Sequence, residues 1–512
     1  MRKILLTLIS FVALSALVAC GGGSSNNSIS LPPAPSGGNN AGFSNASLTG
    51  NYVFVVNGIT QNTNFAVAGV FTADGNGNIT SGVRDTVNDA GGQTLNESIS
   101  GSYNVNQDGR GQAVLNGGAG QVIYRFVLQT PFAPSPVVGK LFQDGTTSNN
   151  IIIDAVGRIE AQATPSTTVA GTYIVSLDGE DSGENIYGAV GGLTFSGGSI
   201  SGTIDENDNG NFDLNGSLPA TGSYSFSGNG RGTVAYVTPN STAFTPTPQG
   251  NHNFIAYYVS PSHLDLISTD PKFFLHGYTD LQTSVSANTA AFTGSQVFSL
   301  SGYDNNGARV ETGRLTLDGL GNLTNAIEDY DTTSNFFSGV SLAGSSYTVG
   351  ANGRWIANLV NAAAASTTGL VGWQVSPGQS AVLTTNTNVL EIGTMRTQTL
   401  GLTNASVTGN YAEAFSGSSS TLQSNLELTG NLLADGAGNL SGTYDSQTDT
   451  SGLTLDAGTS GNYTVDPTLG RSTSGNINGL PVVIYTVNAD TIYFISAQQG
   501  NVYQGMMVSQ QP

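Results

Sequence analysis

Four arginines recur at one position of a repeated pattern, and each repeat carries an aspartate at the end of its third predicted strand. The arginines are Arg110, Arg231, Arg354 and Arg471. The aspartates are Asp85, Asp205, Asp329 and Asp445. A guanidinium group can bind a carboxylate through two parallel hydrogen bonds, so we expect one Arg–Asp ion pair to close each repeat. An anion-binding arginine in each repeat is the functional alternative, but a position that recurs in every copy usually serves the repeated fold.

Acidic and amide side chains gather in two segments that resemble calcium-binding loops. The first segment is Asp74-Gly-Asn-Gly-Asn78. The second contains the calcium candidates Asp205, Asn207, Asn209 and Asp213. In the second segment Gly216 stands where a calcium loop needs a bidentate glutamate, and no helix is predicted on either side. Asp, Asn and Gly are also the residues that tight turns select, so we predict bare hairpin loops and no cofactor, with Ca²⁺ as the alternative.

Catalytic motifs are not evident in the chain. The three histidines, His252, His263 and His276, have spacings that match no local metal-ligand pair. No G-x-S-x-G sequence, Walker loop or cysteine nucleophile is present. Paired carboxylates of a glycoside hydrolase meet in space and leave no fixed spacing, so a secreted glycan hydrolase stays an alternative. We predict that the protein is not an enzyme.

Four similar segments must position these residues. They open with Leu48-Thr-Gly-Asn-Tyr52, Val169-Ala-Gly-Thr-Tyr173, Phe292-Thr-Gly-Ser-Gln296 and Val407-Thr-Gly-Asn-Tyr411. The period is about 120 residues, which indicates tandem repeats. In the first repeat, alternating runs between turn signals predict eight strands, near residues 51–57, 64–72, 78–87, 96–106, 111–116, 122–128, 136–143 and 150–162.

The connections are short and none suits a crossover helix, which predicts antiparallel neighbours. The expected fold class is therefore all-β, with four tandem meander domains of about eight strands that close as small up-and-down barrels. A β-sandwich with the same strands is the alternative. The opening Gly-x-Tyr strand and the Asp-Gly hairpin resemble the start of avidin-type and lipocalin-type barrels. This resemblance concerns pattern alone, and no biotin-binding or lipid-binding residue can be carried over from it.

The N-terminus has the layout of a secretory signal peptide. Arg2 and Lys3 precede a mostly apolar run, Ile4–Ala16, which is too short to span a membrane. The sequence Leu17-Val-Ala-Cys20 resembles the lipobox of bacterial lipoproteins. The resemblance implies cleavage before Cys20, the only cysteine of the chain, and attachment of lipid to it. It also implies localisation at the outer membrane or cell surface, because Gly21 stands where an Asp favours retention in the inner membrane.

Composition supports an extracellular, multidomain protein. Of the 14 Lys and Arg residues, Arg2 and Lys3 would be removed, which leaves 12 against 34 acidic residues, a net charge of −22. Such a surface repels nucleic acid, so the expected membrane contact is through the lipid alone. The predicted segments are a signal peptide and anchor (1–20), a Gly/Ser/Asn/Pro tether (21–46) and β repeats at 47–163, 169–283, 290–400 and 405–512.

The role predicted from these features is that of a non-enzymatic structural, adhesive or binding protein of the cell envelope. The first alternative is small-ligand binding inside the barrels, which requires an apolar cavity in each interior. The glycan hydrolase is the second alternative. The envelope or extracellular partner is not specified by any motif.

Overall fold

The computed structural model describes most of the chain beyond the N-terminal region. The described residues are 41–60, 63–118, 120–129, 138–144, 152–181, 183–209, 211–212, 218–238, 250–270, 273–361, 366–419, 424–449 and 452–510. The predicted signal peptide with Cys20, most of the tether, and Asp213 of the calcium candidates lie outside them. In the part of the chain that the structure describes, no helix has the length and hydrophobicity needed to cross a membrane.

Repeat 1 is a closed antiparallel barrel in which strands adjacent in sequence are adjacent in space. Its strands are β1 (Thr49–Thr60), β2 (Asn64–Asp74), β3 (Asn78–Asn88), β4 (Gln93–Val105), β5 (Arg110–Gly117), β6 (Gly120–Gln129), β7 (Val138–Asp144) and β8 (Ile152–Ala161). The barrel closes where β1 pairs with β8. The predicted all-β, up-and-down barrel is therefore confirmed, and the sandwich alternative is wrong for this repeat.

Repeat 4 is a second closed barrel with the same order. Its strands are β27 (Thr408–Ser419), β28 (Ser424–Asp435), β29 (Asn439–Thr448), β30 (Gly452–Asn462), β31 (Arg471–Ile477), β32 (Leu480–Asn488), β33 (Thr491–Ser496) and β34 (Asn501–Gln510).

Repeat 2 is a nine-stranded sheet that also closes into a barrel. Its strands are β9 (Gly171–Asp181), β10 (Ile186–Ser196), β11 (Ser199–Asp208), β12 (Asn211–Phe212), β13 (Leu218–Phe226), β14 (Arg231–Thr238), β15 (Gly250–Ser260), β16 (His263–Ser268) and β17 (Phe273–Leu281). One edge strand, β10, pairs with both β9 and β11, and this second pairing brings the two ends of the sheet together.

Repeat 3 has an interrupted sheet, although a bridge between Asn322 and Ser346 and the backbone hydrogen bond from Leu323 to Ser345 still connect its two edges. Its strands are β18 (Thr293–Asp304), β19 (Gly307–Asp318), β20 (Leu323–Thr332), β21 (Phe336–Ser341), β22 (Ser346–Val349), β23 (Arg354–Asn361), β24 (Ser366–Ser376), β25 (Gln379–Thr384) and β26 (Val389–Thr397). The sheet order runs from β21 to β22, so the two edges are consecutive strands. The place of the single fourth strand of repeat 1 is thus taken by two short pieces, separated by residues 342–345.

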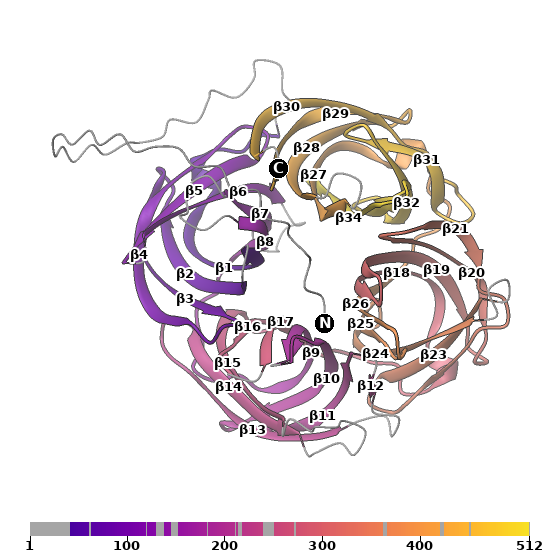
Figure 1. The fold of residues 1–512 in the computed structure, drawn as a ribbon, viewed down its shortest axis with the longest axis horizontal. Helices are drawn as coiled ribbons and strands as arrows, with labels where there is room; N and C mark the ends of the chain where they lie inside the picture. The colour runs from indigo at the N-terminus through magenta and orange to yellow at the C-terminus, as the bar shows by residue number, and fades with distance from the viewer. Residues whose placement is uncertain are drawn as a thin grey trace, which may run out of the picture. The chain divides into compact units, whose positions relative to one another are not determined.

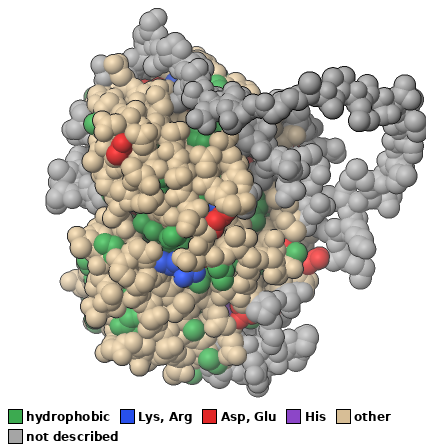
Figure 2. Space-filling view, turned by 90° about the vertical axis from the view of Figure 1, so that its left-hand side faces the viewer, with side chains coloured by type: hydrophobic (Ala, Val, Ile, Leu, Met, Phe, Trp, Pro, Cys, Tyr) green, Lys and Arg blue, Asp and Glu red, His purple; other side chains and the backbone are tan. Residues whose placement is uncertain are grey.

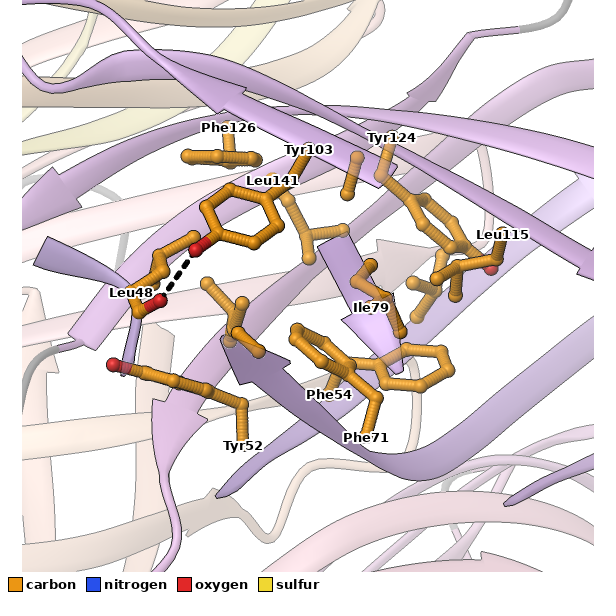
Figure 3. Packing of buried hydrophobic residues seen from close by; sticks show 14 of the residues in the cluster. Leu48, Tyr52, Phe54, Phe71, Ile79, Tyr103, Leu115, Tyr124, Phe126 and Leu141 are labelled. Atoms are coloured by element: carbon orange, nitrogen blue, oxygen red, sulfur yellow. Dashed lines mark hydrogen bonds between the residues drawn. The ribbon is translucent and has the colours of Figure 1, made fainter. Parts of the chain in front are cut away.

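The barrel interiors are filled with apolar side chains. In repeat 1, Tyr52 and Phe54 of β1 pack with Phe71 of the adjacent strand β2 and with Tyr124 and Phe126 of β6 (Figure 3). Alternate residues of β1, Val53 and Val55, face outward into a different apolar cluster. A strand that is buried on both faces must be apolar almost throughout, which is the sequence pattern of β1.

In each repeat, one tyrosine hydroxyl donates a hydrogen bond to a carbonyl oxygen just before the first strand of the barrel. The Tyr103 hydroxyl donates a 2.6 Å hydrogen bond to the Leu48 carbonyl oxygen, as the dashed line in Figure 3 shows. Tyr224, Tyr347 and Tyr463 bind the carbonyl oxygens of Val169, Phe292 and Val407 in the same way. Short 3₁₀ turns precede three of the barrels: η1 (Asn45–Ser47), η3 (Thr289–Ala291) and η4 (Asn404–Ser406). Ala41 and Phe43, which composition assigned to the tether, are already buried in the core of repeat 1.

Contacts between the repeats form a closed cycle from repeat 1 through repeats 2, 3 and 4 and back to repeat 1 (Figure 1). One apolar cluster joins repeats 1 and 2, a second joins repeats 2 and 3, and a third joins repeats 3 and 4. Repeat 4 meets repeat 1 through an ion pair between Arg110 and Asp445 and through hydrogen bonds of Gln510. The four repeats therefore form one ring in which each repeat contacts two others.

Candidate functional site

The recurring arginines and aspartates all lie at the junctions between repeats. Arg231 binds Asp85 of repeat 1 through Nε (2.7 Å) and Nη2 (2.8 Å). The same two-point contact joins Arg354 to Asp205 and Arg471 to Asp329. The expectation that each pair closes its own barrel is thus wrong, because each arginine binds the aspartate of the preceding repeat. These aspartates point out of their own barrels, where the nearest partner is the neighbouring repeat.

An aromatic donor completes each of these three contacts. Tyr257 donates to Asp85 at 2.5 Å, Tyr485 donates to Asp329 at 2.5 Å, and the Trp373 indole donates to Asp205 at 2.7 Å. Burial and the adjacent carboxylate raise the pKa of Tyr257 well above its usual value, so the phenol keeps its proton and remains a donor. We call each such group of arginine, aspartate and aromatic residue a clasp.

The junction of repeat 4 with repeat 1 has a different form. Arg110 binds Asp445 through Nη1 (2.9 Å), Asp108 through Nε (2.8 Å) and Asp456 through Nη2 (2.8 Å). Val127 pairs with Arg110 across β5 and β6, at the position where Tyr257, Trp373 and Tyr485 stand in the other repeats. Burial lowers the pKa of Arg110, but the three carboxylates outweigh burial and raise it, so the guanidinium stays charged.

A cavity of about 760 Å³ lies at the centre of the ring and is bounded by all four repeats. We call it the central cavity. Its lining includes Lys140, Arg158, His263, Arg396, Tyr493 and Met506. These residues come from the last two strands of the four repeats, which also present a recurring glycine: Gly157, Gly277, Gly393 and Gly505. A Cβ atom on Gly157 would stand 1.9 Å from the Val55 carbonyl oxygen, so the close approach of first and last strand requires glycine there.

A network of charged groups from repeats 1 and 2 occupies one side of the central cavity. The Arg158 guanidinium binds the carboxylates of Asp265 and Glu160 and lies 5.3 Å from the centre of the Tyr278 ring. His263 places Nε2 3.3 Å from Glu160 Oε2, and its Nδ1 lies 2.6 Å from Asp280 Oδ1.

The network fixes the charges of its members. Burial lowers the pKa of His263, but Glu160, Asp265 and Asp280 outweigh this effect and raise the pKa well above its usual value. Burial raises the pKa of Glu160, yet His263 and Arg158 lower it further than burial raises it. The imidazolium and the carboxylates therefore neutralise one another.

Glu160, His263 and Asp265 also have the spacing of metal ligands, since their ligand atoms lie within 4.8 Å of one another. Arg158 binds both carboxylates of this trio, so a cation already occupies the position that a metal would take. The chemistry that the present geometry supports is that of an ion-pair network.

The other histidines lie apart from this network. His252 is buried in repeat 2 beside Tyr236 and Phe273, with Nε2 3.5 Å from Glu206 Oε1. His276 lines a smaller cavity of about 160 Å³, next to Asp178 and Glu180. The smaller cavity shares Asn57, Val156 and other residues with the central cavity, so the two adjoin.

The calcium candidates have structural partners in the described residues. Asp205, Asn207 and the preceding residues belong to β11, a strand rather than a loop, and Asn209 follows it in a left-handed conformation (φ 48°). The Asp205 carboxylate binds Arg354 and Trp373, and Asn207 donates to the Thr384 carbonyl oxygen.

The Asp-Gly-x-Gly-Asn segment is a tight turn held by its own aspartate. Asp74 accepts hydrogen bonds from the backbone N–H groups of Asn76 and Asn78 and from the Asn78 side chain. Asp318 and Asp435 make the same contacts in repeats 3 and 4. These donors lower the pKa of Asp435 to about 2, so the carboxylate is ionised at neutral pH.

The recurrence of Arg and Asp among the four repeats identified the clasp residues in the sequence, but no such recurrence pointed to the residues of the central cavity. The Glu160–His263 contact joins residues of two repeats, and its members differ in the other copies: the counterparts of Glu160 are Asp280, Arg396 and Val508, each three residues after the recurring glycine. Aligning the last strands on that glycine would have shown a charged position in three of the four repeats.

No protein-family model and no curated protein sequence matches the chain. Among solved structures, intact Ap-TbpB (N and C lobes) has 11% sequence identity and a TM-score of 0.17, over 75% of this chain and 85% of that one. The isotype 1 transferrin binding protein B from serogroup B Neisseria meningitidis has 10% identity and a TM-score of 0.17, over 76% and 83% of the two chains. With TM-scores this low, neither likeness bears on function. The fold and the site instead define a ring of four antiparallel β domains around a charged cavity.

Proposed function

We propose that this protein is an exported, lipid-anchored and non-enzymatic binding protein of the cell envelope, which holds a small ligand in the central cavity of the ring. The observation that carries the proposal is the cavity of about 760 Å³ that residues of all four repeats line. Ligand sites in proteins have volumes of roughly 300–1,000 Å³ and combine apolar walls with a few polar groups. The lining has both, because Phe142 and Met506 accompany Lys140 and Arg396.

The site between the barrels is favoured over a site inside them. Apolar clusters fill the interiors of all four repeats. In repeat 4, the cavity beside Phe415 and Phe494 has only about 10 Å³, room for at most about one water molecule. A glycan hydrolase is disfavoured because Glu160 and Asp265 are bound by Arg158, whereas a hydrolase needs one carboxyl free to donate a proton.

The proposed location at the cell envelope rests on Cys20 and the predicted signal peptide before it. A chain attached by lipid at Cys20 would hold the ring close to a membrane surface, since each buried CH₂ contributes about 0.8 kcal/mol. Cells fed a fatty-acid probe should label the wild-type protein. Equal labelling of a Cys20→Ala variant would rule out attachment at this residue.

A neutral fluorescent probe tests binding in the central cavity. We expect N-phenyl-1-naphthylamine to bind the wild-type protein with increased emission. Ser416 lines the cavity, so Ser416→Trp should fill the space and abolish the signal. Ser441→Trp, a change of the same size at an exposed position of the same repeat, should leave it intact. Equal signals from both variants would contradict the proposal.

A further inference from the structure

In the part of the ring that the structure describes, two positively charged side chains have no ion pair or hydrogen bond. Among the described residues, the arginines other than Arg396 each form an ion pair or, for Arg314, hydrogen bonds to neighbouring oxygens. Lys140 and Arg396 have no ion pair or hydrogen bond within this part of the chain, and Arg396 Nε is buried without an acceptor. In a protein with 34 acidic residues and 14 basic ones, two unpaired cations are unexpected, because acidic partners are in excess.

Both cations line the central cavity. Lys140 lies on β7 of repeat 1 and Arg396 on β26 of repeat 3, so the two repeats contribute one charge each. They are close enough to interact: burial, Arg158 and Arg396 together lower the pKa of Lys140 to about 8, against the smaller opposing effect of Glu160. Like charges that face one cavity destabilise each other unless an anion lies between them.

The carboxylates of the cavity cannot serve as that anion. Glu160 binds Arg158 and lies beside His263, and Asp280 lies 2.6 Å from Nδ1 of the same histidine. Asp265 is buried against Arg158. The three acids carry three negative charges against the two positive charges of Arg158 and His263, so they offset at most one of the charges of Lys140 and Arg396, and one positive charge remains.

The wall of repeat 4 has a different character. Ala414, Tyr493 and Met506 line it together with the polar residues Ser416, Thr429 and Gln504, and no acidic or basic residue of repeat 4 is among the lining residues. At the positions where repeats 1 and 3 carry Glu160 and Arg396, repeat 4 has Val508. The cavity is thus charged on one side and uncharged, with some apolar surface, on the other.

We propose that the ligand of the central cavity is a small molecule with one anionic group, a carboxylate or phosphate, and an apolar body. Lys140 and Arg396 bind the anionic group, and Tyr493 and Met506 contact the apolar body. The inference rests on the proposed function, because it assigns a ligand class to the same cavity.

Displacement of N-phenyl-1-naphthylamine from the full mature chain tests the ligand class. Octanoate, octan-1-ol and octylammonium share one chain and differ in charge, and inorganic phosphate supplies an anion without an apolar body. We expect octanoate to displace the probe at concentrations at least about tenfold lower than octan-1-ol, because charge-assisted hydrogen bonds are the stronger kind. Phosphate alone should displace little.

Two double variants identify the residues. Lys140→Met with Arg396→Met should reduce the affinity for octanoate to that for octan-1-ol, while probe binding persists. Lys140→Arg with Arg396→Lys keeps both charges and should keep the preference for octanoate. Because the pKa of Lys140 is about 8, with Arg158, Glu160 and Arg396 facing it, octanoate binding to the wild type should weaken as pH rises from 7 to 9. It should not weaken in Lys140→Arg.

The outcomes separate the two proposals. If the probe binds and Ser416→Trp blocks it, but octan-1-ol or octylammonium competes as well as octanoate, the anion assignment is overturned and the binding proposal stands. An octanoate preference that survives in the Met double variant also overturns the assignment. If the probe does not bind the wild type, or Ser416→Trp leaves its binding unchanged, the proposed function fails and the ligand class fails with it.

Discussion

The junctions between consecutive repeats differ from the junction that returns repeat 4 to repeat 1. At the first junction, β2 presents Ala66, Ala68 and Val70 to repeat 2, and all three are buried in an apolar cluster. At the same register of β28, repeat 4 presents Glu427, Thr429 and Asn431 to repeat 1. The described residues give no apolar cluster across this closing junction. Its contacts are polar, such as the hydrogen bonds that the Gln510 side chain donates to the carbonyl oxygens of Asp108 and Leu128.

The ion pairs differ in the same way. In the three clasps, one aspartate receives two bonds from an arginine and one from an aromatic residue. At the closing junction, one arginine is shared by Asp108, Asp445 and Asp456. Arg110 is 1% exposed at its side chain, whereas Arg231 is 20% exposed, so the closing arginine is the more deeply buried.

The difference follows from chain connectivity. Consecutive repeats are held together by a short linker, which gives their faces a high effective concentration, so apolar faces are seldom exposed. Repeats 4 and 1 have no such link, and their faces are exposed whenever the ring opens. An apolar face there would bind a second copy of the chain head to tail and build open polymers. A polar face closes the ring with less risk of association.

Exchanging apolar and acidic residues between the two junction faces should change the free energy of unfolding more than the other variants do. Ala66→Glu buries a carboxylate without a partner in the first junction, and we expect it to lower the free energy of unfolding by more than about 3 kcal/mol. The reverse change at the closing junction, Glu427→Ala, removes the acceptor of the Ala155 backbone N–H and should cost about 1 kcal/mol. Urea denaturation measures both. Similar losses from the two variants would show that the junctions do not differ in polarity.

Loss of one aspartate should distinguish the clasps from the closing ion pair. Asp85→Ala leaves Arg231 and Tyr257 buried without their shared acceptor, which should cost about 3 kcal/mol. Asp445→Ala should cost about 1 kcal/mol, because Arg110 keeps Asp108 and Asp456. The midpoints of thermal unfolding should fall in this order. A larger fall for Asp445→Ala would mean that the closing junction depends on this single pair.

Variants of the glutamines at the ends of repeats 2 and 4 test whether a linker protects a junction against local opening. Gln282 and Gln510 each donate to carbonyl oxygens of the next repeat. Gln510→Ala should raise amide hydrogen exchange in β6 and β28, because no linker holds the closing junction together. Gln282→Ala should change exchange in β24 less, and each variant should lose about 1 kcal/mol. Equal exchange in the two variants would argue against a special role for the linkers.

A pH effect at the closing junction should be the smallest. Burial raises the pKa of Asp445 above its usual value despite the opposing charge of Arg110. The folded chain therefore binds this proton more tightly than the unfolded chain, and the stability from Asp445 is lost as pH rises from the unfolded pKa through the raised one. The unfolding midpoint of the wild type, taken relative to that of Asp445→Asn, should fall as pH rises from 4 to 7. A relative midpoint that rises over this range would contradict the raised pKa.

Strands, turns and repeats could be predicted from the sequence because they depend on local patterns. Alternation placed the eight strands of repeat 1, and the Asp74–Asn78 turn depends on a carboxylate and amides within five residues. The break of the fourth strand in repeat 3 was missed, since the Ala343-Gly344 segment differs little from other turns.

The partners of the clasp residues could not be predicted from repetition. A pair within one repeat and a pair between neighbours give the same periodic sequence, because each copy contains one Arg and one Asp either way. The central cavity was missed for a related reason: the positions of Lys140 and Arg396 carry different residue types in the other repeats, and only the ring brings repeats 1 and 3 together.

Closure of the ring is the central claim, and coupling between Arg110 and Asp445 tests it most directly. The two residues are 335 positions apart in the chain and meet only if repeat 4 returns to repeat 1. A double-mutant cycle with Arg110→Met, Asp445→Leu and both changes, followed by denaturation at low protein concentration, measures their interaction. A closed ring predicts a coupling free energy above about 1 kcal/mol. Strictly additive losses, with a coupling free energy of zero, would contradict a closed ring.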